Sequence, residues 1–360
     1  MRVDELGRMT SGSEPLKVVI TGGAGFIGSN LTRYWCQTAP DDEVVVFDAL
    51  TYAGHRESLV ELEVLKRLTF VRGDIRNIEE VSPVVKGADL VLHLAAESHN
   101  DRAIVDPLAF VSSNVMGTAV LLEACRRGNV TRLHHVSTDE VFGSLDLDSP
   151  SRFTSESHYR PRGPYSASKA GSDHLVRAWH ETYGLSTTIS NSGNNFGPYQ
   201  HPEKLIPLSI IRFISGRKMT VYGDGENVRD WIYVTDHCAA LQLIARRGHA
   251  GATYLISAQN ELANKEVVMA IAELAGVPGS QIEFVPDRAG HDRRYALTPS
   301  ESLLDWGWKP ATSFKSALRT TVEWYQSHSS WWGPLMPGPG HRVLDGKEGP
   351  DRLGGLGTRN

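Results

Sequence analysis

Residues 18–30 read VVITGGAGFIGSN, and this stretch decides the fold of the chain. A short β-branched run precedes Gly22, Gly25 and Gly28, and a helix-forming sequence follows them. Glycine allows a tight turn and lets the backbone approach a phosphate, because no Cβ stands in the way. Free N–H groups at the start of the following helix attract the same anion. The strand, the glycine turn (residues 22–28) and the helix together predict a dinucleotide-binding site.

Short apolar runs alternate with helical stretches through the first half of the chain. The predicted strands are 17–21, 43–48, 69–74, 90–96, 133–138 and 187–192, and the predicted helices are 27–38, 77–85, 108–127 and 165–183. This alternation is typical of βαβ units around a parallel sheet that is covered on both faces. We therefore predict an α/β fold with a Rossmann-type, doubly wound parallel sheet, in which ligands bind at the carboxyl ends of the strands.

The pattern divides the chain into four segments. Residues 1–14 are polar, and residues 334–360 are rich in glycine, proline and charge, so both ends are expected to be disordered. Residues 15–195 are expected to form the dinucleotide-binding domain, with a return to it near residues 230–262. After residue 195 glycine and proline interrupt the alternation, which predicts a smaller C-terminal substrate-binding domain over 196–333.

Bulk composition argues against several classes of partner. The net charge of −5, with no dominant basic stretch, does not suggest a nucleic-acid ligand. No apolar run approaches the roughly 18 residues that a membrane span needs, so no membrane contact is expected. The three cysteines are far apart and the histidines show no metal-ligand spacing. We therefore expect no disulfide framework, no metal site and a reducing, cytoplasmic location.

Two acidic residues extend the dinucleotide prediction. Asp48 ends the second predicted strand, twenty residues after Gly28. A carboxylate there accepts hydrogen bonds from ribose hydroxyls and repels a 2′-phosphate, which favours NAD over NADP. Asp74 follows the third strand and could reach the adenine. The predicted cofactor-binding residues are Gly22, Gly25, Phe26, Ile27, Gly28, Asp48, Asp74, Ile75, Ala95, Tyr165 and Lys169.

The segment GPYSASKAGSD (163–173) places Tyr165 and Lys169 four residues apart, on one face of a predicted helix. An ammonium group beside a phenol favours the phenolate and lowers the phenol pKa from its ordinary value of about 10. The phenolate can then take a proton from a substrate hydroxyl while hydride leaves the same carbon. With the glycine turn upstream, the chain resembles the extended short-chain dehydrogenase/reductase family. That resemblance implies a Rossmann-type fold with NAD across the strand ends.

The segment STDEVFG (137–143) puts two carboxylates directly after a predicted strand. Two like charges so close raise the pKa of one carboxyl group, so one can stay protonated while the other is ionised. Such a pair suits the elimination of water, in which a base takes a C–H proton and an acid protonates the departing hydroxyl. An enzyme that only oxidises an alcohol, or epimerises a sugar, does not need it.

Six segments together resemble the dTDP-glucose 4,6-dehydratase family: STDEVFG, AAESHNDR (95–102), YSASKAGSD, GPYQHPEKLIPL (197–208), YGDGENVRDWIYVTDH (222–237) and DRAGHDRRYA (287–296). The resemblance runs from about residue 16 to 334. It implies a tightly bound NAD that is regenerated in each turnover, and a dTDP-hexose substrate. It also implies that Tyr165 deprotonates the sugar 4-hydroxyl while Thr138 hydrogen-bonds that oxygen. Glu140 would then remove the C5 proton, and Asp139 would protonate the leaving C6 hydroxyl.

The matching segments also suggest a binding site for the sugar nucleotide. Its diphosphate requires cations, which Lys204, Arg229, Arg288 and His291 are expected to present. The predicted substrate-binding residues are Glu97, Ser98, Asn195, Glu203, Lys204, Leu205, Arg229, Asn264, Arg288 and His291. Departures from the family pattern include Phe142, where tyrosine is usual, Asn191, where arginine is usual, and Asn100, which replaces an apolar residue.

Helices 108–127 and 165–183 carry apolar residues on more than one face. The resemblance implies that they form the four-helix interface of a homodimer, and burial within one chain is the alternative. Three other functions stay open at this point. A UDP-sugar 4-epimerase shares the glycine turn and the Tyr165–Lys169 pair, and a 4,6-dehydratase could act on a variant nucleotide hexose. An NAD-binding regulatory or scaffold protein would be expected to lack that pair.

Overall fold

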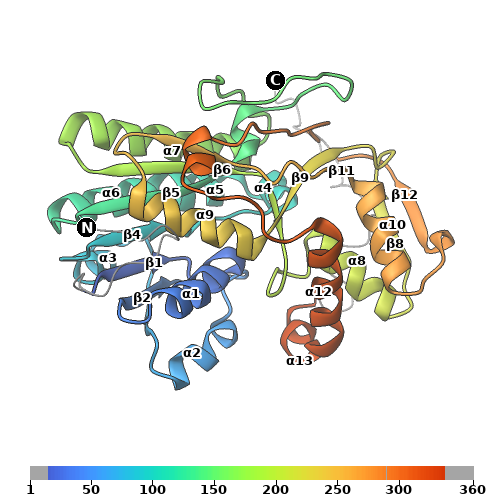
Figure 1. Ribbon diagram of the computed structural model, residues 1–360, viewed down its shortest axis with the longest axis horizontal. Helices are drawn as coiled ribbons and strands as arrows, with labels where there is room; N and C mark the ends of the chain where they lie inside the picture. The colour runs from blue at the N-terminus through green and yellow to red at the C-terminus, as the bar shows by residue number, and fades with distance from the viewer. Residues whose placement is uncertain (1–14, 289, 337–360) are drawn as a thin grey trace, which may run out of the picture.

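The computed structural model describes residues 15–288 and 290–336, which form two lobes (Figure 1). The larger lobe is a seven-stranded sheet with helices on both faces, and the smaller lobe holds two short sheets and three longer helices. The expected disordered leader, residues 1–14, lies outside the described residues, as do residues 337–360 of the expected disordered tail, 334–360. The start of that expected tail is ordered, because Gly333–Leu335 form a 3-10 turn.

All seven strands of the large sheet pair in parallel, in the order β10-β6-β5-β4-β1-β2-β3. Their bounds are β1 Lys17–Thr21, β2 Glu43–Asp48, β3 Thr69–Arg72, β4 Leu90–His93, β5 Arg132–Thr138, β6 Thr187–Ser192 and β10 Thr253–Ile256. The predicted doubly wound sheet is therefore confirmed, with the strand order reversing between β1 and β4. Strands β3 and β4 end earlier than predicted, because residues 73–74 and 94–96 leave the sheet as loops. No strand was predicted for β10.

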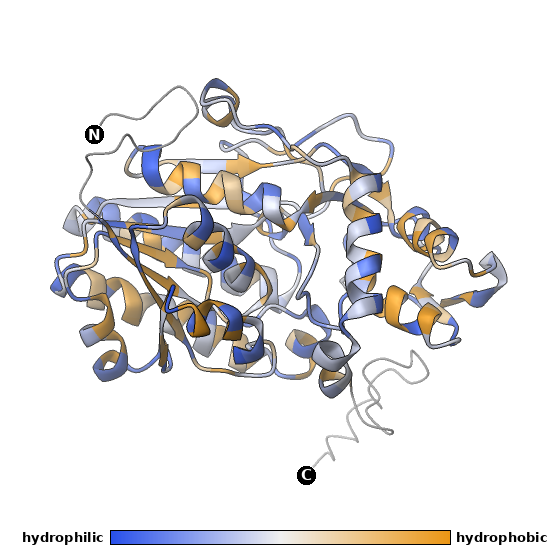
Figure 2. Cartoon of the chain, turned by 60° about the horizontal axis from the view of Figure 1, so that its bottom comes forward, coloured by the Kyte–Doolittle hydropathy of each residue, from blue (hydrophilic) through white to orange (hydrophobic). Residues whose placement is uncertain are grey.

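Helices cover both faces of this sheet. Helices α1 (Phe26–Thr38) and α9 (Val234–Arg247) pack side by side on one face, and α3 (Ile78–Val85), α6 (Gly117–Arg127) and α7 (Pro164–Tyr183) pack on the other. Alternate residues of β1 point to opposite faces, so Val18 and Ile20 enter one core while Val19 enters the other. Figure 2 shows hydrophobic residues along the strands of this central sheet.

Local sequence explains where the main helices begin and end. Helix α7 starts with Pro164 in its first turn, where the missing N–H costs nothing. It stops at Gly184, whose φ of 70° is left-handed and easy for glycine. The Asn77 side chain accepts a hydrogen bond from the Glu79 N–H and so caps α3. The four predicted helices agree with the structure to within one residue at each end.

The predicted helix 108–127 is a continuous helical stretch of three parts. These are α5 (Pro107–Phe110), a π-helical turn over Val111–Met116 and α6. By length and composition alone this stretch could cross a membrane, with a mean hydropathy of 1.5, so the statement that no run is long enough was wrong. Serine, threonine and glycine interrupt its apolar residues without adding charge. It remains weak evidence for a span, because 44% of the stretch is buried in the fold.

The smaller lobe is built from the chain after β6. One sheet joins β7 (Asn194–Phe196), β9 (Val228–Tyr233) and β11 (Glu261–Ala263), and another joins β8 (Met219–Tyr222) and β12 (Ile282–Val285). Helices α8 (Leu205–Ile214), α10 (Asn264–Leu274) and α12 (Phe314–Ser327) enclose a third apolar core with them. Short helices that no pattern predicted are α2 (Val60–Val64), α4 (Asn100–Val105), α11 (Glu301–Asp305) and α13 (Ser329–Trp332).

The glycine turn joins β1 to α1 with almost no free space. A Cβ on Gly28 would lie 2.1 Å from the Gly22 carbonyl oxygen. We therefore expect Gly28→Ala to push α1 away from β1 and to lower the free energy of unfolding by about 1–3 kcal/mol. Thermal unfolding followed by circular dichroism measures this change. Gly279→Ala is the control, because a Cβ there meets nothing within 4 Å. Equal melting temperatures for the two variants would contradict the expectation.

Candidate active site

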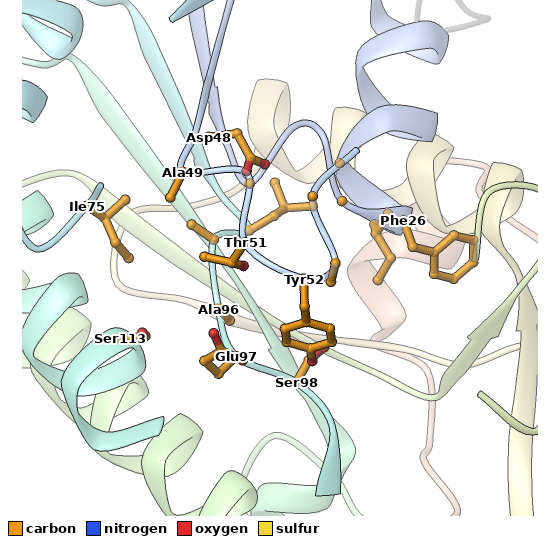
Figure 3. Close-up of a pocket in the computed structure, with 18 of the residues that line it drawn as sticks. Phe26, Asp48, Ala49, Thr51, Tyr52, Ile75, Ala96, Glu97, Ser98 and Ser113 are labelled. Carbon is orange, nitrogen blue, oxygen red and sulfur yellow. The ribbon is translucent and has the colours of Figure 1, made fainter. Parts of the chain in front are cut away.

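A cavity of about 290 Å³, the first cavity, opens at the carboxyl ends of the large sheet. All eleven predicted cofactor-binding residues line it: Gly22, Gly25, Phe26, Ile27, Gly28, Asp48, Asp74, Ile75, Ala95, Tyr165 and Lys169. Figure 3 labels predicted residues such as Asp48 together with residues that no sequence motif identified, among them Thr51 and Tyr52 on the loop after β2 and Ser113 on the π-helical turn. The motif-based residues therefore converge on one space.

Two of the acidic residues that line this cavity, Asp48 and Asp74, differ in the groups that bind their carboxylates. Asp48 is buried, and its carboxylate accepts hydrogen bonds from the N–H groups of Ala24 (2.9 Å) and Leu50 (2.8 Å). Burial raises the pKa of Asp48, and these two bonds oppose the rise. Asp74 is instead held by the Arg76 guanidinium, whose hydrogen bonds lower the Asp74 pKa. Arg76 therefore occupies much of the capacity of the Asp74 carboxylate to accept hydrogen bonds, which was expected to serve the adenine.

The residues expected to do chemistry meet between β5 and α7. Thr138 ends β5, and Asp139 and Glu140 begin a 3-10 turn, Asp139–Phe142. The Thr138 hydroxyl accepts from the Glu140 N–H (3.3 Å) and donates to Asp139 Oδ1 (3.3 Å). Tyr165 from the first turn of α7 forms a hydrogen bond with Thr138. The five predicted catalytic residues therefore form one group, in which Lys169 lies one helical turn after Tyr165.

The pKa of Tyr165 is raised well above its ordinary value, and this corrects the expectation of a lowered pKa. Burial is the main cause, followed by the charges of Glu140 and Asp139, while the hydrogen bond with Thr138 opposes them. Sequence spacing showed Lys169 but could not show that two carboxyl groups face the same phenol. Lys169 is itself buried, which lowers its pKa to about 8.

Asp139 and Glu140 have different environments although they are adjacent. Asp139 is buried and its Oδ2 forms no hydrogen bond in the described part of the chain. Burial and the neighbouring Glu140 raise the pKa of Asp139 well above its usual range, which favours the protonated form of its carboxyl group. The Glu140 carboxylate instead accepts a hydrogen bond from Asn100 Nδ2 (3.1 Å). The two adjacent carboxyl groups therefore differ in environment, and the pKa of one of them is raised, as the sequence predicted.

A second cavity of about 190 Å³ lies against the smaller lobe and shares Glu203 and Lys204 with the first. The predicted substrate-binding residues that line it are Glu203, Lys204, Leu205, Arg229, Asn264, Arg288 and His291, whereas Glu97 and Ser98 line the first cavity. Asn195 lines neither, and its side chain bonds to Ser192 and Gly193 instead. Strand β7 alternates its side chains, so the neighbouring Asn194 faces the second cavity.

All four predicted cations line the second cavity, but their environments differ. Arg229 is buried and donates to the carbonyl groups of Val228 (2.8 Å) and Asp292 (2.9 Å). Arg288 pairs with Asp101 at 3.2 Å, and burial lowers the pKa of Lys204. His291 was predicted to be a cation, but burial, together with Arg288 and Arg229, lowers its pKa to about 4. It is therefore neutral at pH 7 and can only hydrogen-bond a ligand.

Sequence reasoning missed two residues that shape this site. Asn100 was noticed only as a departure from the family pattern, and the structure places it on Glu140. Asn114, in the π-helical turn, pairs with both the N–H (2.8 Å) and the carbonyl (3.0 Å) of Glu97, and so fixes the loop after β4. Within residues 15–288 and 290–336, no cluster of three or more metal-ligating side chains is found.

Comparisons with known proteins agree with this geometry. A sequence profile described as GDP-mannose 4,6 dehydratase matches residues 19–321. The dTDP-glucose 4,6-dehydratase of Mycobacterium tuberculosis is 50% identical over 321 residues, which cover 89% of this chain and 96% of that protein. The crystal structure of DesIV (dTDP-glucose 4,6-dehydratase) from Streptomyces venezuelae, with NAD and TYD bound, superposes with a TM-score of 0.87 at 44% identity and covers 89% of this chain and 100% of that chain.

An epimerase is also similar in structure, but less so. The UDP-glucose 4-epimerase of Thermus thermophilus in complex with NAD superposes with a TM-score of 0.79 at 32% identity, covering 87% of this chain and 100% of that chain. The shared scaffold explains this similarity, since both kinds of enzyme use the same sheet. Both the higher identity and the Asp139–Glu140 pair favour the dehydratases.

Proposed function

The chain belongs to the dTDP-glucose 4,6-dehydratase family, and from this premise we propose that it converts dTDP-glucose to dTDP-4-keto-6-deoxyglucose with loss of water. One observation carries the assignment: a buried Asp139 with a raised pKa lies beside Glu140, next to Tyr165 and Lys169. Oxidation at C4 requires only the tyrosine and the lysine. The carboxyl pair is required only if water is eliminated.

The first cavity fits NAD as the cofactor. The glycine turn leaves no room for a Cβ at Gly22 or Gly28, which allows the close approach that a diphosphate requires. Asp48, fixed by two backbone N–H groups, offers a carboxylate for ribose hydroxyls at the end of β2. When bound, NAD supplies a hydride acceptor for C4 and a hydride donor for C6, so that the cycle ends without net oxidation.

The first step requires a base for the sugar 4-hydroxyl, and we assign this role to Tyr165. Thr138 hydrogen-bonds the Tyr165 hydroxyl and can share the same proton. Two carboxyl groups disfavour the phenolate, and the raised pKa of Asp139 reduces its share of that effect. The Lys169 ammonium, on the same helical face, is the cation that favours the phenolate.

Elimination then uses the two carboxyl groups. A ketone at C4 makes the C5 proton acidic, and Glu140 removes that proton. Asp139 donates its proton to the C6 hydroxyl, the C6–O bond breaks and water leaves. The Asn100 hydrogen bond holds one Glu140 oxygen, so the other oxygen is available for the C5 proton.

The second cavity is assigned to the sugar nucleotide. Arg229, Arg288 and Lys204 gather positive charge there, and arginine is suited to paired contacts with phosphate oxygens. Because this cavity shares Glu203 and Lys204 with the first, a ligand can bind with its hexose near Glu140 and its diphosphate near the arginines.

We further propose a cytoplasmic homodimer. The stretch from Pro107 to Arg127 exposes Leu108 (75%), Val111 (50%) and Met116 (60%) beside α7. A second copy that packs the same two helices against this surface would bury them in a four-helix bundle. The apolar character of this stretch suits such an interface, and a membrane span does not follow from it. All three cysteines are buried free thiols, as expected in a reducing compartment.

The decisive experiment supplies purified protein with dTDP-glucose and no added coenzyme. We expect the product mass to be lower than that of the substrate by one water. A C4-deuterated substrate should deliver its label to C6, because only a dehydratase moves hydride between these carbons. UDP-glucose in a parallel reaction tests the alternative, a 4-epimerase, which would give an isomer of equal mass. Folded protein that contains NAD and yields no dehydrated sugar would contradict the proposed function.

Asp139→Asn tests the assigned acid. Asparagine has nearly the same size but cannot donate a proton to the leaving hydroxyl, so elimination should slow by about 10²- to 10⁴-fold. Oxidation at C4 should be affected much less, and a 4-keto sugar that keeps its C6 hydroxyl should accumulate. Rapid chemical quench with mass spectrometry quantifies both sugars. Equal slowing of oxidation and elimination would rule out the assigned role.

Asn100→Leu tests the hydrogen bond to the proposed base. Leucine fills a similar volume without a donor, and a hydrogen bond to a charged group contributes about 1.5–3 kcal/mol, or at least about tenfold in rate. We expect C5 proton removal to slow, so that the isotope effect with C5-deuterated substrate rises while that with C4-deuterated substrate falls. Asn100→Asp, which adds a carboxylate beside Glu140, should be slower still. Unchanged isotope effects in the leucine variant would show that Asn100 does not assist Glu140.

A further inference from the structure

A buried polar network contacts Lys169. His135 Nε2 lies 3.2 Å from Lys169 Nζ and 3.2 Å from Asp173 Oδ1. Asp173 Oδ2 accepts hydrogen bonds from the hydroxyl groups of Ser137 (2.9 Å) and Tyr159 (2.8 Å). His135 and Asp173 line neither cavity, and no step proposed above uses them.

Burial of these charged and polar groups lowers the stability of the fold, so their presence suggests a functional role. The side chains of His135 and Asp173 are only 1% and 0% exposed. A buried charge is tolerated only when it is paired and hydrogen-bonded, and an apolar pair of similar volume would serve packing equally well. Burial alone would raise the pKa of Asp173, but His135, Lys169 and Ser137 lower it, so Asp173 is ionised. His135 is neutral at pH 7, because burial and Lys169 lower its pKa to about 4.

The secondary structure directs these groups toward one nitrogen. Tyr165, Lys169 and Asp173 follow one another at four-residue intervals, so they lie along one face of α7. His135 and Ser137 are two residues apart on β5 and therefore point to the same face of the sheet, toward α7. Lys169 Nζ also donates to the Val136 carbonyl (2.9 Å), so its position is determined from the strand as well as from the helix.

We propose that His135 and Asp173 are positioning residues of the dehydration reaction, a role that rests on the function proposed above. Asp173 supplies the negative charge that keeps Lys169 ionised in a dry environment. His135 fixes the Lys169 nitrogen at a constant distance from that charge. Together they would maintain the ammonium group on which the Tyr165 phenolate depends.

Loss of His135 or Asp173 is predicted to change the pH dependence of dehydration and of NAD binding. The sign of this change follows from the charges around Lys169. The groups that face Lys169 are His93 of β4, His135 of β5, and Tyr165 and Asp173 of α7. Arg177 and Tyr159 lie beyond Asp173. Burial lowers the Lys169 pKa to about 8 and Asp173 opposes this shift. Without Asp173 the ammonium group, which is present below that pKa, would be lost at a lower pH.

The test compares Asp173→Asn and His135→Leu with wild type and with a matched control, His134→Leu. His134 is the preceding residue of β5, is equally buried, and contacts Thr188 (2.8 Å) and Ser190 (3.0 Å) instead of Lys169. Two quantities are measured from about pH 6 to pH 10, the range around the ordinary pKa values of histidine and lysine. They are the rate of dTDP-glucose dehydration and the NAD dissociation constant from tryptophan fluorescence.

We expect the alkaline midpoint of both profiles to move down by about one pH unit in Asp173→Asn, the usual effect of one nearby opposite charge. His135→Leu should move it in the same direction, because an acceptor for the ammonium group is lost. His134→Leu should lower thermal stability and leave both midpoints in place. Variants whose rates fall with unchanged midpoints would have a purely structural defect and would overturn the inference.

Two further outcomes separate the inference from the function on which it rests. If wild-type protein does not dehydrate dTDP-glucose, the proposed function fails, and the pH dependence of NAD binding still reports the charge on Lys169. If Asp173→Asn does not fold, His135→Leu carries the test alone, since it leaves all charged groups in place. Wild-type midpoints in that variant would then overturn the proposal.

Discussion

The contact between Gly28 and the Gly22 carbonyl is the constraint on which the rest of the molecule depends. With a Cβ at Gly28 only 2.1 Å from that oxygen, no other residue lets α1 start where β1 ends. This turn sets the first cavity at the carboxyl edge of the sheet. Because all seven strands are parallel, the ends of β4 and β5 reach the same edge and bring their loops to it. Glu97 and Ser137 therefore line the same cavity as the glycine turn although they are distant from it in sequence.

Charge is the second constraint, since several ionisable groups share a space with little water. Asp139, Glu140 and Tyr165 would together repel one another if all were ionised. The raised pKa of Asp139 favours its protonated form, which carries no charge, and the Lys169 ammonium offsets a remaining negative charge. The same proton is the one that the leaving hydroxyl requires, so in the proposed reaction the property that makes the cluster stable also makes Asp139 an acid.

The sequence predicted what depends on local pattern and missed what depends on distant contacts. Periodicity placed six strands and four helices. The glycine motif, the acids at the strand ends, the Tyr165–Lys169 pair and the family resemblance together identified eleven residues that line one cavity. The prediction from sequence failed for Asn195, because a shift of one residue along β7 changes which side chain faces the second cavity. It also failed for the charge of His291 and the direction of the Tyr165 pKa, because burial and partners from other elements decide both. Strand β10, only four residues long, has too little sequence to show a period.

Helix α7 holds residues of the proposed active site and of the buried network on one rigid element. Its face toward β5 carries Tyr165 and Lys169 at the cavity and Asp173 deeper in the core, on successive turns. A rigid helix keeps these three in register, whereas a loop would let each move separately. Phe142 packs 5.1 Å from the Tyr159 ring, and that ring directs its hydroxyl at Asp173. The departure at position 142 therefore lies beside the far end of the network that reaches Lys169. Phe142 lines neither cavity, but it shares the turn Asp139–Phe142 with both carboxyl groups, so this departure can act on the proposed reaction through that turn as well as through Tyr159 and Asp173.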